Sequence, residues 1–170
     1  MPTPDEWAVA LARQAKADIS TWNYLQTADL PECKKLLFLQ MACEKLVKAH
    51  LCDQGSAPSS LQSSHAYTAK NLPGVIRVQL TILRAKPKLI RAIVSFTKRI
   101  AREIELLAPA VDDGGRRPDN CEYPWEDRGH QLWVPVDWTF FTDQFVKSPV
   151  GLKFLKLVHE AIERFASPTS

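Results

Sequence analysis

The strongest fold signal in the chain is the segment PECKKLLFLQMACEKLVKAHLCD, from Pro31 to Asp53. Its apolar residues recur every three or four positions, which places them on one face of an α-helix. Pro31 suits a first helical turn, and Gly55 suits the position just past a helix end. The apolar face consists of Leu36, Leu39, Cys43, Leu46, Val47 and Leu51. The segment predicts a long amphipathic helix that Gly55 stops.

Three other stretches carry the same periodicity: about Asp5 to Asp29, Pro87 to Ala108 and Pro149 to Phe165. The apolar face of the first stretch consists of Trp7, Leu11, Ala15, Ile19, Trp22 and Leu25. That of the second consists of Ile90, Ile93, Thr97, Ile100, Ile104 and Leu107. That of the third consists of Leu152, Leu155, Val158, Ile162 and Phe165. Four such helices without a convincing strand predict an all-α, up-down bundle of four long helices plus one or two short ones.

The connection after Asp53 is less regular. Residues 56–64 are rich in serine and predict a loop, and Ser64 is expected to cap a short helix from His65 to about Asn71. Pro73 and Gly74 are expected to break that helix. The apolar stretch from Val75 to Leu83 fits a strand or a short helix, and we favour the helix because no partner strand is visible.

Residues 109–148 are predicted to form an irregular, aromatic-rich insertion in a single domain that spans residues 1–170. Pro124 and Pro135 prevent a continuous helix there, and residues 112–118 have the composition of a turn. Tyr123, Trp125, Trp133 and Trp138 accompany Arg116, Arg117 and Arg128. Such aromatic residues can pack the insertion onto the bundle, stack on bases, or form a protein interface.

Composition narrows the class of protein. The chain has 170 residues, of which 45% are hydrophobic and 24% charged, as is typical of a globular domain with a real core. No apolar run approaches the roughly 20 residues of a membrane span, and the acidic N-terminus does not resemble a signal peptide. We therefore expect a cytoplasmic protein without a membrane contact.

The sequence lacks the motifs of several kinds of metal, cofactor and catalytic site. The four cysteines, at positions 33, 43, 52 and 121, lack the spacing of a zinc site, and buried thiols are the simpler interpretation. The chain contains no dinucleotide-binding glycine motif, Walker loop, nucleophile elbow or zinc-protease motif. We therefore expect no metal and no cofactor, and no catalytic residue is identified by motif.

Charge is strongly segregated along the chain. No Asp or Glu occurs from Gln54 to Arg102, a span with nine basic residues, whereas eight acidic residues lie between Glu103 and Asp127. On the helix predicted from Pro87, five bases fall within roughly 100° of arc, opposite the apolar face. They are Lys88, Arg91, Lys98, Arg99 and Arg102. This stripe fits the phosphates of RNA or a nucleotide, although a solvated helix face has the same pattern.

The stretch from Phe38 to Leu51, FLQMACEKLVKAHL, resembles the signature helix of HEPN-domain proteins. Asp18 in the first helix, the pair Ser64-His65 after a loop, and the Asn-x-Glu-Tyr-Pro-like element from Asn120 to Trp125 follow the family order. The resemblance covers most of the chain and is tight over residues 38–72.

The resemblance implies a bundle of four or five helices, a homodimer, and a role in nucleotide or RNA transactions in prokaryotes. Some members of the family pair with a minimal nucleotidyltransferase, and others are ribonucleases of toxin or phage-defence systems. In such a protein Glu44, Lys45 and Lys48 would line a groove shared with a dimer mate. Glu44 and Lys48 can equally form a simple ion pair, and His65 can contact phosphate or be structural.

The ribonuclease branch carries an Arg and, after four to six intervening residues, a His near the last helix. This chain departs from that motif, because its nearest match is Lys153 and His159. The ammonium group of lysine does not replace the planar guanidinium with which arginine forms two parallel hydrogen bonds to a phosphate. The sequence thus favours a non-catalytic RNA- or nucleotide-binding module, with a ribonuclease and a protein-interaction subunit as alternatives.

Overall fold

The computed structural model describes residues 2–62, 65–109 and 119–167. In these ranges it has five long helices: α1 (Pro4–Leu25), α2 (Glu32–Asp53), α4 (Thr68–Ile82), α5 (Pro87–Glu105) and α7 (Pro149–Ala166). Two short helices, α3 (Pro58–Gln62) and α6 (Phe141–Val146), complete the set. The prediction of an all-α bundle is confirmed. Within the described ranges, no helix combines the length and the apolar character needed to cross a bilayer.

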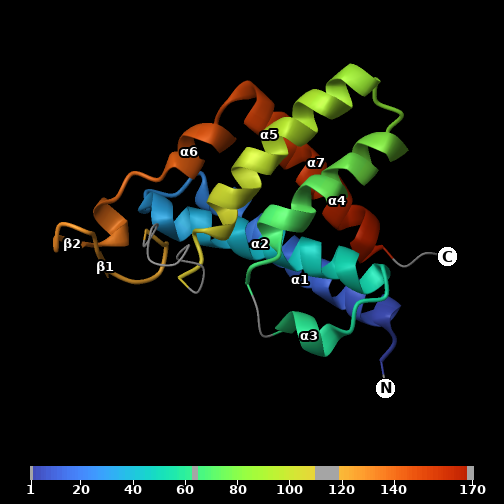
Figure 1. Cartoon of the computed structure of the whole chain (residues 1–170), viewed down its shortest axis with the longest axis horizontal. Coiled ribbons are helices and arrows are strands. Elements are labelled where there is room, and N and C mark those ends of the chain that lie inside the picture. Colours follow the sequence, from blue (N-terminus) through green and yellow to red (C-terminus); the bar gives the residue numbers. More distant parts are fainter. Residues whose placement is uncertain (1, 63–64, 110–118, 168–170) are drawn as a thin grey trace.

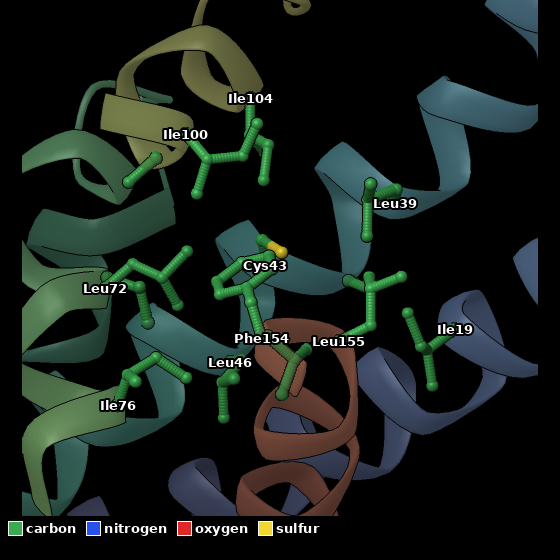
Figure 2. Close-up of a cluster of buried hydrophobic side chains, with 14 of the residues drawn as sticks. Ile19, Leu39, Cys43, Leu46, Leu72, Ile76, Ile100, Ile104, Phe154 and Leu155 are labelled. Carbon is green, nitrogen blue, oxygen red and sulfur yellow. The ribbon is translucent and has the colours of Figure 1, made fainter. Parts of the chain in front are cut away.

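The helices pack in pairs around a central α2. Helix α1 lies along α2, α4 lies along α5, and α7 packs against both α1 and α4 (Figure 1). One buried cluster contains side chains from all five long helices. Figure 2 shows Cys43 and Leu46 of α2 near Leu72 of α4, Ile100 of α5 and Phe154 of α7. Because α2 has neighbours on most sides, 14 of its 22 residues are buried, including polar ones.

The predicted end of α2 is confirmed in detail. Gly55 has a φ angle of +86°, which a residue with a side chain adopts only at a cost. The N–H of Ser56 donates to the carbonyl of Leu51 over 2.9 Å, and that of Gly55 donates to Cys52 over 2.8 Å. This pair of bonds is a Schellman motif, which satisfies carbonyls that the helix end leaves without partners.

The predicted break at Pro73 is wrong, because α4 runs through it as one helix. The missing N–H of Pro73 removes one hydrogen bond, and an internal proline costs about 3 kcal/mol. Leu72, Val75, Ile76 and Leu80 of α4 are buried, and each contributes about 1.5–3 kcal/mol. Burial therefore outweighs the proline, and a fifth long helix replaces the two short segments that the sequence predicted.

Smaller differences concern the ends and faces of helices. Helix α1 ends at Leu25 rather than Asp29, and α5 ends at Glu105 rather than Ala108. The predicted loop of residues 56–64 contains α3, whose Leu61 is buried. Leu152, predicted to lie on the apolar face of α7, is 59% exposed. The expected cap at Ser64 lies outside the described residues.

The insertion is more ordered than its composition predicted. Strand β1 (Trp125–Glu126) pairs with β2 (Leu132–Trp133) in an antiparallel hairpin, and a 3₁₀ helix (Pro135–Asp137) and α6 follow. Trp138 makes edge contacts with Trp125 and Trp133, at ring-centroid distances of 5.5 and 5.1 Å. Packing is thus one role of these three tryptophans. The predicted turn at residues 112–118, with Arg116 and Arg117, lies outside the described residues.

Candidate functional site

A stripe of polar residues on α2 faces a pocket. Gln40, Glu44 and Lys48 are one helical turn apart, so they share one face of α2, and each is more than nine-tenths buried. The pocket, which we call the α2 pocket, has a volume of about 510 Å³. Its other walls come from His65, from Ala108 and Pro109 after α5, and from Glu122 and Tyr123 of the insertion. The fold therefore joins segments far apart in sequence around this stripe.

Glu44 is the centre of the hydrogen bonds in this pocket. Its Oε1 accepts a bond from Nζ of Lys48 over 2.6 Å, and its Oε2 accepts one from Nε2 of Gln40 over 2.8 Å. Nδ1 of His65 lies 2.9 Å from the same Oε2. Burial acts to raise the pKa of Glu44, but the bonds from Lys48, His65 and Gln40 together outweigh it and hold the pKa below its ordinary value. Glu44 is therefore a carboxylate at neutral pH.

Lys45 is fixed by a second ion pair, which crosses from α2 to α1. Its Nζ lies 2.6 Å from Oδ2 of Asp18, a buried residue of α1. Oδ1 of Asp18 also accepts a bond from Gln14 over 3.3 Å. The pair holds the Lys45 side chain at the pocket wall. Asp18, one of the residues that carry the resemblance to HEPN-domain proteins, thus positions a pocket residue.

The pocket offers hydrogen-bond donors next to a fixed carboxylate. Because Glu44 holds Nδ1 of His65, the other ring nitrogen remains for a ligand, and the His65 side chain is 47% exposed. The ammonium of Lys48 has three N–H donors, and one of them serves Glu44. The sequence left open whether Glu44 and Lys48 form an ion pair or line a groove. The structure shows that they form an ion pair and that they line a pocket with Lys45.

The basic stripe occupies the outer face of α5. All five predicted residues are exposed, whereas Ile93, Ile100 and Ile104 on the opposite side are buried. In the described part of the chain, no ion pair involves four of the five bases. These four are Lys88, Arg91, Lys98 and Arg99. Their charge is therefore presented to solvent rather than neutralised within this part of the fold.

Two aromatic residues that sequence analysis missed lie beside this stripe. The guanidinium carbon of Arg99 is 5.3 Å from the ring centroid of Phe145 on α6. Phe141, one turn earlier on α6, packs on Phe145 with a centroid distance of 4.3 Å. A pair of phenylalanines four residues apart was the available sequence signal. Only the packing of α6 against α5 shows that this pair adjoins a basic residue.

The structure separates Lys153 from His159. Nε2 of His159 lies 3.2 Å from Nδ2 of Asn23 on α1, and burial lowers the pKa of this histidine. Lys153 instead lines a pocket between α7 and the α4–α5 pair. Six residues in an α-helix place two side chains about 120° apart around its axis. The two candidate residues of the ribonuclease alternative thus point to different neighbours.

The described residues include no group of three His, Cys, Asp or Glu side chains arranged to hold a metal ion. All four cysteines are free and buried. Burial raises the pKa of Cys43 to about 12, and it also raises the pKa of Cys33, Cys52 and Cys121. The interpretation of the cysteines as buried thiols is confirmed.

No known protein family model, curated protein or solved structure matches this chain. The resemblance to HEPN-domain proteins therefore rests on the quoted residues and stays a prediction. Three of its elements, Glu44 with Lys45, His65, and Glu122 with Tyr123, line the same pocket.

Proposed function

We propose that this protein is a non-catalytic RNA-binding module whose contact surface is the basic face of α5. We define the basic face as Lys88, Arg91, Lys98, Arg99 and Arg102. The observation that carries the proposal is the exposure of all five cations on one face of a 19-residue helix whose opposite face is buried. Side chains spread along such a helix can contact successive phosphates of a nucleic acid strand.

The net charge of the chain does not explain such binding by itself. The formal charge is only +3, so a general attraction to polyanions is weak. Binding must therefore come from the local concentration of charge on α5. Release of counterions from phosphates supplies the free energy, which makes the affinity depend steeply on salt.

The α2 pocket supports a second candidate ligand, a nucleotide. Lys45, Lys48 and His65 line one cavity, and each carries donors that suit a phosphate. The resemblance to HEPN-domain proteins adds a homodimer, a possible nucleotidyltransferase partner and a cytoplasmic location to this proposal. These additions depend on the resemblance alone.

Fluorescence anisotropy with end-labelled single-stranded RNA, measured across a salt series, tests the proposal. Each phosphate contact is expected to steepen the slope of log affinity against log salt by about 0.7. The variant Arg91→Glu/Lys98→Glu/Arg102→Glu should abolish binding at moderate salt. The control variant Arg13→Glu/Lys34→Glu/Lys156→Glu has the same net charge and alters exposed residues of α1, α2 and α7 rather than the basic face of α5. It should retain most of the affinity.

The same samples on a denaturing gel separate the alternatives. Intact RNA with a steep salt slope supports the binding module. Cleaved RNA, with cleavage lost in His159→Ala, would replace it with the ribonuclease. No binding even at low salt would overturn the proposal and favour a protein-interaction subunit.

A further inference from the structure

A pocket of about 370 Å³ opens directly beside the basic face. Its walls are Phe96 and Arg99 of α5, Gln144 and Phe145 of α6, and Ser148 and Val150 at the start of α7. Arg99 belongs to both the basic face and this pocket, which we call the Arg99 pocket. A strand whose phosphates follow α5 would therefore pass the mouth of an aromatic cavity.

The aromatic rings of the pocket, Phe96 and Phe145, are extended outside its lining by the ring of Phe141. Phe145 packs against buried Phe96 with a centroid distance of 5.7 Å, and Phe141 packs on Phe145 at 4.3 Å. Phe141 is 50% exposed, so part of its ring surface remains open to a ligand. The guanidinium of Arg99 over Phe145 adds a second planar group. Aromatic rings and guanidinium planes are the groups on which unpaired bases stack.

The start of α7 holds this aromatic surface in place. Gly151 of α7 allows close approach of α6, because a Cβ atom there would lie 2.1 Å from the carbonyl oxygen of Phe145. Oγ of Ser148 donates to that same carbonyl over 2.7 Å and accepts from the N–H of Gly151. Gln144 is exposed at the rim, where its amide has both a donor and an acceptor. An aromatic surface with one polar side chain that can donate or accept a hydrogen bond suits any of the four bases.

We propose that the Arg99 pocket, together with the ring of Phe141 that packs on its Phe145 wall, binds an unpaired base, so that the RNA recognised by the basic face is single-stranded. The inference rests on the proposed function, since the phosphates of the strand must lie along α5. In a duplex the bases are paired and stacked on one another. They therefore cannot stack on an aromatic surface that lies beside the phosphate backbone. The combination of a cationic track and stacking rings is instead typical of proteins that bind single strands.

Three labelled probes of equal length test this inference: a single-stranded RNA, the corresponding duplex, and a strand with the same number of phosphates but no bases. We expect the single-stranded RNA to bind at least about tenfold more tightly than the strand without bases. Phe141→Ala should remove most of that advantage and leave binding of the strand without bases unchanged. A 2-aminopurine base in the RNA should lose fluorescence on binding, and this quenching should be absent in Phe141→Ala.

Two variants separate stacking from folding. Phe141→Tyr retains the ring and should retain binding and quenching. Tyr24→Ala removes an exposed ring on α1, 75% exposed, and should change neither. Circular dichroism should be the same for Phe141→Ala and the unaltered protein, and thermal unfolding should show a cooperative transition at a slightly lower temperature, because the ring of Phe141 is half-exposed and packs only partly on Phe145.

The outcomes distinguish this inference from the proposed function. Equal affinity for strands with and without bases, unaffected by Phe141→Ala, would overturn the base pocket and leave the basic face intact as an RNA contact. Preference for the duplex, or competition by polyglutamate as strong as that by single-stranded RNA, would also overturn it. Failure of all probes to bind at low salt would overturn the proposed function itself.

Discussion

Nζ of Lys48 lies 2.6 Å from Oε1 of Glu44, one turn earlier on α2, and each of the two residues is only 7% exposed. An exposed pair at this spacing contributes about 0.3–0.5 kcal/mol, whereas loss of one partner from a buried pair costs about 3–5 kcal/mol. Burial therefore converts a common helix spacing into a structural requirement at the wall of the α2 pocket.

Replacement of Lys48 by Met should lower the free energy of unfolding by about 2–3 kcal/mol. The loss is below the usual range because Glu44 keeps its contacts with Gln40 and His65. Urea unfolding measures it, and the double variant Glu44→Gln/Lys48→Met should be destabilised by less than the sum of the two single variants. The control Lys34→Met, at an exposed site, should change stability by under about 0.5 kcal/mol. A similarly small change for Lys48→Met would show that its charge is not buried against Glu44.

His50 should make stability fall as the pH drops below 6.5. Burial lowers the pKa of His50 from 6.5, with Asp53 opposing and Arg164 assisting the shift. The unfolded chain therefore takes up a proton near pH 6.5 while the folded chain stays neutral, so stability is complete above that pH and declines below it. The stability advantage of the unaltered protein over His50→Asn should narrow between pH 7.5 and 5.5 in urea unfolding.

His50→Phe provides the matched comparison, because it also removes the titrating group but not the aromatic contact with Phe165. The difference in free energy of unfolding between the unaltered protein and His50→Phe should change with pH in the same direction as the difference between the unaltered protein and His50→Asn. A pH-independent difference for both variants would contradict the assignment.

Two glycines should respond to alanine with opposite signs. Gly55→Ala should destabilise the protein by about 1 kcal/mol, because the φ of +86° disfavours a Cβ atom although no atom lies within 4 Å of it. Gly74→Ala should stabilise it by about 0.5–1 kcal/mol, because Gly74 lies inside α4 with open space at its Cβ position. Thermal unfolding measures both changes. Destabilisation by Gly74→Ala would indicate that α4 is interrupted after Pro73.

The four thiols should be unreactive in the native protein. Each is at most 1% exposed, and burial raises the pKa of each, to about 12 for Cys43. Since the thiolate is the reactive form, Ellman's reagent should modify few thiols over minutes in buffer and all four in denaturant. Rapid modification of one thiol in buffer would show that the helix carrying it opens readily.

The helices that bury one clear face were predictable from sequence. The spacing of Leu36, Leu39 and Cys43 defined α2, and Gly55 defined its end, because both depend on local geometry. The basic face of α5 was equally visible, since the angular position of each side chain on a helix follows from its number. Both features needed no knowledge of neighbouring helices.

The continuity of α4 and the two pockets could not be predicted in this way. Pro73 is a helix breaker by local propensity, and only the burial of its neighbours against the rest of the bundle reverses that preference. The Arg99 pocket depends on the packing of α6 against α5, and no spacing within one segment encodes a contact between Phe145 and Arg99.

The sequence by itself determined where the long amphipathic helices lie, with which face inward, and where positive charge accumulates, because these properties repeat with the period of the helix. Only the tertiary structure decided that Glu44, Lys48 and His65 meet in one pocket and that Phe145 lies against Arg99 of the basic face. Such contacts join residues distant along the chain, and their position depends on how helices pack, which is set by the shape of the whole core rather than by any local pattern.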